Sequence, residues 1–187
     1  MSNKNRIYFC VYRQQGFAGS DGNPRVFHCG LWVESKSSRG GGHYFHVQFH
    51  GRRPVNRPNY PDGWEYGTSV TRDREANWRQ SNNIIGRILL GKLPAGVDAR
   101  HIHQICAAVR MPREGTDENC WDWAHWAIRD IQRQGWLQSF PWSGRDGFAA
   151  RAQRQAVKWY EGDRGRVPAN HKWDYFGIES GGHCAVM

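Results

Sequence analysis

The hydrophobic pattern of the chain changes period near residue 95, and this change limits the folds that the chain can adopt. Upstream, apolar residues alternate as in a half-buried strand; in residues 27–34 one face holds Phe27, Cys29, Leu31 and Val33. Further strands are predicted over residues 7–12, 44–50, 64–71 and 84–93. Downstream, apolar residues recur at helical spacing. Sequential strands followed by helices predict an α+β fold, in which an antiparallel sheet of about five strands packs against helices.

The length of 187 residues fits one domain with a full core. We expect a single domain over residues 1–187, with a strand-rich part (1–95), a helical part (96–162) and a loose C-terminal tail (163–187). The sequence contains no internal repeat and no segment typical of an interdomain linker.

Composition points to a cytoplasmic protein with reduced thiols. No apolar run approaches the roughly 20 residues of a membrane span, and the first residues lack the apolar core of a signal peptide. The five cysteines, at positions 10, 29, 106, 120 and 184, form no Cys-x-x-Cys pair and are odd in number. This pattern favours free thiols over a disulfide framework or a zinc site.

The net charge is +9, and 21 of the 26 basic residues are arginine. Arginine suits the recognition of phosphate and carboxylate groups, so an anionic membrane surface, nucleic acid or an acidic protein are candidate partners. The arginines are scattered rather than gathered on one element, which argues against a dedicated nucleic-acid module without removing that class.

The best-marked helix carries a cysteine near its start. Thr116 is its expected N-cap and Gly135 its expected C-terminal stop. The positive end of a helix dipole favours thiolate over thiol, so Cys120 is a candidate nucleophile. Asp117 and Glu118 oppose this role, because nearby negative charge raises the pKa of a thiol. The alternative is that Cys120 is a small buried apolar residue.

Two histidines could assist this cysteine. His28 and His46 share the same alternation parity on neighbouring strands, which allows a base and the residue that orients it to meet. Both, however, lie opposite the apolar face on which the Cys120 helix is expected to pack. His43 and His50 are competitors for the orienting position.

Three ordered blocks carry a family resemblance: His28-Cys-Gly-Leu-Trp-Val33, Tyr44-Phe-His-Val47 and Asn119-Cys-Trp-Asp-Trp123. Their order and spacing resemble the lecithin:retinol acyltransferase-like family, a circularly permuted branch of the NlpC-type papain-like thiol enzymes. The resemblance implies a papain-like core, His28 as the base, His46 as its orienting partner, and attack by Cys120 on a carbonyl to give a thioester. Other permuted papain-like hydrolases, including peptidases, share the order of histidine before cysteine.

The residues around these blocks complete the expected site. Asn119 and Trp121 flank the cysteine and are expected beside the oxyanion. The aromatic residues Trp32, Tyr44 and Trp123 are candidates for a substrate pocket. No cofactor is expected, and no metal either, because the pair His101 and His103 lacks a third ligand nearby.

These observations predict a thiol hydrolase or acyltransferase that acts on acyl-lipid or amide substrates. A cysteine peptidase or isopeptidase that uses the same residues is the nearest alternative, with a peptide or protein amide as its substrate. A non-catalytic module of the same fold, which binds membrane, nucleic acid or protein, is the alternative from another class.

The last four residues, Cys184-Ala-Val-Met187, match the prenylation signal, and the terminal Met indicates farnesyl. One prenyl chain holds a membrane only weakly, so the arginines would have to supply the second signal. Membrane association of a cytoplasmic protein through Cys184 is therefore an expectation from the sequence.

Overall fold

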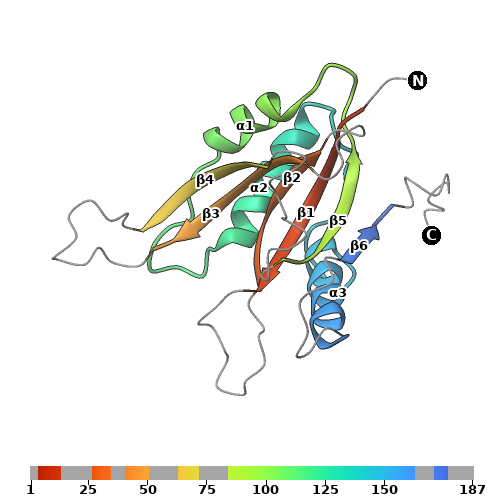
Figure 1. Ribbon diagram of the computed structural model, residues 1–187. Coiled ribbons are helices and arrows are strands. Elements are labelled where there is room, and N and C mark those ends of the chain that lie inside the picture. Colours follow the sequence, from red (N-terminus) through yellow and green to blue (C-terminus); the bar gives the residue numbers. More distant parts are fainter. Residues whose placement is uncertain are drawn as a thin grey trace.

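The computed structural model describes residues 4–13, 27–34, 41–50, 63–71, 84–162 and 171–176. They form an α+β fold with one mixed sheet and three helices (Figure 1), which confirms the expected fold class. The strands are β1 (Arg6–Arg13), β2 (Phe27–Glu34), β3 (Gly42–Phe49), β4 (Trp64–Thr71), β5 (Ile84–Lys92) and β6 (His171–Asp174). The helices are α1 (Ala99–Ala108), α2 (Cys120–Arg133) and α3 (Phe148–Gly162).

The six strands lie in the order β4-β3-β2-β1-β5-β6. The first four form an antiparallel meander, and β5 returns to pair with the free side of β1. The expected sheet of about five antiparallel strands is corrected at one edge, where β6 pairs in parallel with β5. This strand lies within residues 163–187, the expected tail, and its four residues are too few to show an alternation in the sequence.

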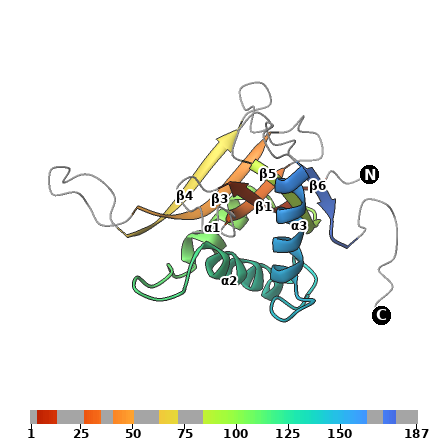
Figure 2. The ribbon, with the colours of Figure 1, turned by 90° about the horizontal axis from the view of Figure 1, so that it is seen from below.

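The helices lie against one face and one end of the sheet. Figure 2 shows α1 and α2 side by side below β2 and β3, with α3 beside β5. The main core lies between α2 and the sheet, where Phe9, Leu31, Trp123 and Ile128 are almost fully buried. A second, smaller cluster lies on the opposite face of the sheet and contains Tyr8, Cys10, Trp32, Tyr44, Ile84 and Leu89.

The fold bears only partly on the expected membrane association. Within the described part of the chain, none of the helices has the length and apolar run that a membrane crossing needs. Cys184 lies outside the described residues, so its farnesylation stays a prediction.

Candidate active site

Helix α2 begins at Cys120 itself, and its N-cap is Asn119 rather than the expected Thr116. The Asn119 side-chain oxygen accepts from the Trp121 backbone N–H at 2.8 Å, and the Asp122 carboxylate accepts from the Asn119 N–H at 2.9 Å. The second of these bonds, together with the bond that the Asn119 side chain accepts from the Asp122 backbone N–H, forms a capping box, which fixes the first turn of the helix. Cys120 is thus the first helical residue, and its own N–H belongs to the N–H groups that have no acceptor within the helix.

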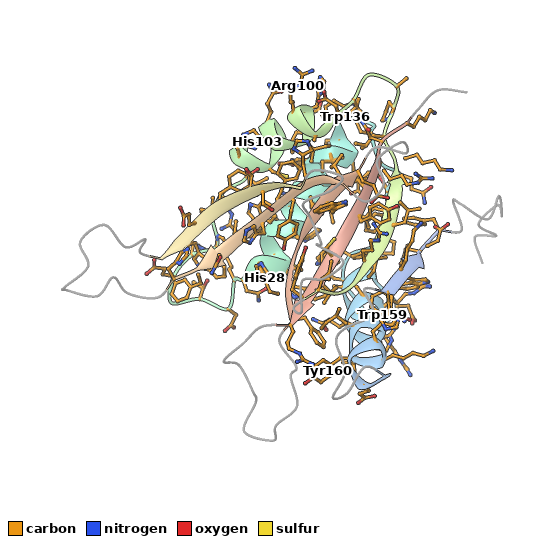
Figure 3. All side chains as sticks on the ribbon, in the orientation of Figure 1. His28, Arg100, His103, Trp136, Trp159 and Tyr160 are labelled. Atoms are coloured by element: carbon orange, nitrogen blue, oxygen red, sulfur yellow. The ribbon has the colours of Figure 1, made fainter. Side chains whose placement is uncertain are left out.

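The structure brings Cys120, His28 and His46 together. The Cys120 thiol is hydrogen-bonded to the side chain of His28. On its other side, His28 Nε2 lies 3.1 Å from His46 Nδ1. Figure 3 shows His28 beside the beginning of α2. Cys120 is 5% exposed, so the thiol lies at the base of the site rather than on the open surface.

A divergence of two strands explains how His28 reaches a cysteine on the helix side of the sheet. The register of β2 with β1 runs over all eight residues of β2, from Phe27 to Glu34. The register of β2 with β3 includes only the half from Leu31 to Glu34. Figure 1 shows β2 and β3 fanning apart towards the end where α2 begins. Because the strands separate beside His28, the start of α2 can approach its imidazole, although the alternation along β2 directs the His28 side chain to the opposite face of the sheet.

Cys29 is a member of the site that the sequence reasoning placed only in the core. Its thiol and its backbone N–H both hydrogen-bond to the sulfur of Cys120. These bonds and the hydrogen bond and charge of His28 hold the pKa of Cys120 well below that of an ordinary thiol, although burial acts in the opposite direction. Burial and the neighbouring Cys120 raise the pKa of Cys29. The pKa values of the two thiols therefore shift in opposite directions, downward for Cys120 and upward for Cys29.

The second histidine is held as a neutral ring. Burial, followed by the charge of His28, lowers the pKa of His46 to about 4. A neutral His46 with its proton on Nε2 presents Nδ1 as an acceptor to the Nε2–H of His28. The His46 ring packs on Gly67 of β4, where an added Cβ would lie 2.7 Å from His46 Nε2. Tyr44 stacks on the same ring, with centroids 4.8 Å apart.

Glu118, one of the two acidic residues expected to raise the pKa of Cys120, is paired with arginines. Glu118 accepts two hydrogen bonds from the Arg110 guanidinium, at 2.7 and 2.8 Å, and one from the Arg113 backbone N–H at 2.9 Å. The bonds from Arg110 and Arg113 hold the pKa of Glu118 below its usual range. The Arg110 guanidinium also lies over the Trp126 ring, 3.6 Å from its centroid. The negative charge of Glu118 is therefore compensated by Arg110 and Arg113.

The other predicted site residues lie in different parts of the fold. Asn119 and Trp121 flank the thiol as expected, but the Asn119 amide oxygen is used in capping and the Trp121 indole donates to the Phe27 carbonyl at 2.8 Å. Of the three candidate pocket residues, Trp123 lies in the main core and Trp32 in the cluster on the opposite face. Only Tyr44 contacts the histidines directly.

The other histidines serve other contacts. His50 pairs with Glu65 at 3.0 Å, His101 joins the cap of α1 through Asp98 at 2.8 Å, and His103 bonds the Tyr66 hydroxyl at 2.9 Å. Among the described residues, no group of three or more His, Cys, Asp or Glu side chains could hold a metal ion.

A surface hollow of about 330 Å³ also lies away from the thiol. It is lined by Val33, Gly42, His43, Asp98 and Arg100. Val33 and Gly42 belong to the paired end of β2 and β3, opposite the end that holds His28. His43, the other competitor for the orienting position, therefore lies at the wrong end of β3 to contact His28.

Fold and site together define an α+β protein in which a cysteine at a helix start faces a pair of hydrogen-bonded histidines. The chain belongs to the family of unknown function DUF6914, whose sequence model matches residues 4–162. The matched range includes Cys120, His28 and His46. No curated protein matches the chain, and no solved structure does.

Proposed function

We propose that the protein is a thiol hydrolase or acyltransferase that forms a thioester on Cys120. The observation that carries the proposal is the chain of contacts from the Cys120 thiol to His28, and from His28 Nε2 to His46 Nδ1 at 3.1 Å. A nucleophile, a base and a residue that orients the base are the three parts of this type of catalysis.

Each step follows from the positions of these groups. The Cys120 thiolate attacks the carbonyl carbon, and the N–H groups at the start of α2 face the oxygen on which negative charge develops. His28 then donates its proton to the leaving alcohol or amine as the carbon–oxygen or carbon–nitrogen bond breaks. Water or an acceptor alcohol attacks the thioester, His28 takes the proton of this nucleophile, and Cys120 leaves as a thiolate.

The order of residues in the chain supports the same chemistry. His28, His46 and Cys120 occur in the order of the lecithin:retinol acyltransferase-like enzymes, and a helix that starts at the cysteine and packs on a sheet is what a papain-like core requires. We infer that the core is of this permuted papain-like type and that the substrate is an acyl ester or amide. An acyl lipid is the first class to test.

Acyl transfer to the enzyme can be measured directly. The purified protein is incubated with a p-nitrophenyl acyl ester and, separately, with phospholipid vesicles and a peptide mixture, and its intact mass is followed. We expect an acyl adduct on the tryptic peptide 114–129, which contains Cys120, and no adduct in Cys120→Ser. The His28→Ala variant should acquire it far more slowly, because the general base usually contributes roughly 10²- to 10⁴-fold.

Cys106 provides the internal control. It is also buried in the core, and burial raises its pKa. A thiol-directed electrophile should label Cys120 well before Cys106. Equal labelling of the two cysteines, with no acyl adduct from any of the substrates, would refute the proposed function.

A further inference from the structure

Two sulfur atoms meet at the base of the site. The Cys29 thiol and the Cys29 backbone N–H both hydrogen-bond to the sulfur of Cys120. Both cysteines are free, and both are buried in the main core, with Cys29 fully inaccessible and Cys120 5% exposed. The Trp121 indole, which donates to the Phe27 carbonyl at 2.8 Å, holds the start of α2 against this part of β2.

We propose that Cys29 and Cys120 are a modification site, at which a hydroperoxide converts the two thiols into a reversible disulfide. The proposal rests on the nucleophilic Cys120 of the proposed function and adds a second role for the residue beside it. The disulfide removes the nucleophile while it lasts, so the site is switched off by oxidant and restored by a dithiol.

The chemistry balances with hydrogen peroxide as the oxidant. The Cys120 thiolate attacks one peroxide oxygen, the S–O bond forms, the O–O bond breaks, and hydroxide leaves and takes up a proton. The Cys29 sulfur then attacks the sulfur of the Cys120 sulfenic acid, loses its proton, and displaces water as the S–S bond forms. Two thiols and one peroxide give one disulfide and two waters, so the peroxide oxygens accept the two electrons that the sulfurs lose.

The geometry selects Cys29 among the described cysteines. A disulfide needs sulfur atoms about 2.05 Å apart and Cα atoms within about 7 Å, so only a sulfur already in contact with Cys120 qualifies. Cys10 pairs with Gly30 in the sheet and belongs to the cluster on the opposite face. Cys106 lies in α1. The burial of both partners also favours a small oxidant, such as hydrogen peroxide, over a bulky disulfide.

Peptide mapping after brief treatment with hydrogen peroxide tests the proposal in the wild-type protein. Trypsin places Cys29 in peptide 26–36 and Cys120 in peptide 114–129, and neither contains another cysteine. We expect these two peptides to appear joined, and to separate again after dithiothreitol. Activity of the treated protein in the acyl-ester assay should be lost and regained in step with the joined peptide.

A variant and a control separate the possible results. In Cys29→Ser the joined peptide cannot form, so peptide 114–129 should accumulate sulfinic acid, which dithiothreitol does not reverse. Cys106→Ser should behave like the wild type. If Cys120 is labelled by iodoacetamide and acquires the acyl adduct, yet oxidises to sulfinic acid in the wild type without the joined peptide, the disulfide proposal is overturned and the proposed function stands. If Cys120 is neither labelled nor oxidised, both fail.

Discussion

Gly67 offers a way to displace His46 without touching the thiol or its base. A Cβ added at Gly67 would lie 2.7 Å from His46 Nε2, which is closer than Cβ atoms approach other atoms in proteins, and 3.2 Å from its Cδ2, which is a tight contact. The end of a side chain yields more readily than the sheet backbone, so Gly67→Ala should push the His46 ring away. The 3.1 Å contact between His28 Nε2 and His46 Nδ1 would then break.

The size of the effect follows from the type of hydrogen bond that is lost. A bond to a charged group contributes about 1.5–3 kcal/mol. A tenfold change in rate corresponds to roughly 1.4 kcal/mol, so losing the hydrogen bond from a charged His28 to His46 corresponds to a roughly 10- to 150-fold slower reaction of Cys120. The assay is the second-order rate of iodoacetamide alkylation of Cys120 near about pH 6, where an ordinary thiol is almost wholly protonated.

The control for this substitution is Gly162→Ala, at the end of α3, where an added Cβ meets nothing within 4 Å. This variant should react at the wild-type rate. Thermal unfolding of both variants shows whether the fold is kept. If Gly67→Ala is as stable as the wild type and Cys120 reacts at an unchanged rate, His46 does not orient His28 and the reasoning is refuted.

Three further predictions concern charge and pH. The pKa of His46 is about 4 in the folded state against an ordinary 6.5, so below pH 6.5 the unfolded chain binds a proton at this residue that the folded chain does not. The free energy of unfolding should therefore fall by up to about 3 kcal/mol as the pH drops to 4. Urea unfolding across this range should show that His46→Asn lacks this contribution, and an identical pH dependence in the two proteins would contradict it. Arg110→Gln removes a positive charge that compensates the Glu118 carboxylate, so the pKa of Cys120 should rise and its alkylation at low pH should slow. Glu118→Gln removes the negative charge itself and should not slow the reaction. Equal slowing by both variants would contradict this and point to distortion of the loop instead. Arg87 pairs with Glu34 at 2.7 Å, and both side chains are nearly buried. Arg87→Leu should therefore lower the free energy of unfolding in urea by about 3–5 kcal/mol, because it leaves a buried carboxylate without its partner charge. Glu34→Gln added to Arg87→Leu should recover much of that loss, and a double variant as unstable as Arg87→Leu would contradict this.

The strands could be predicted from the sequence because their alternation is local. Residues 27–34 and 64–71 have the predicted bounds. In residues 27–34 the alternation marks the face of Phe27, Cys29, Leu31 and Val33, and all four are buried. The first residue of α2 was harder to predict from the sequence, because Thr116 and Asn119 are both good N-cap residues. The deciding signal is Asp122, three residues after Asn119, which closes the capping box.

The arrangement of the site could be predicted only in part. Parity placed His28 and His46 together, and the structure confirms their contact. The same parity placed them on the wrong side of the sheet for Cys120, because the separation of β2 from β3 depends on the packing of α2 and has no local pattern. Cys29 was visible as an apolar-face residue next to His28, but its contact with Cys120 depends on the same separation.

The central claim is that His28 and Cys29 hold Cys120 as a thiolate at neutral pH. The most direct test is the rate of Cys120 alkylation by iodoacetamide as a function of pH, read from peptide 114–129 in the wild type and in His28→Ala. We predict that the wild-type rate stays high well below the ordinary thiol value of 9.0, and that His28→Ala shifts the profile towards that value. A wild-type profile that rises only near the ordinary thiol value, and that His28→Ala leaves unchanged, would contradict the account.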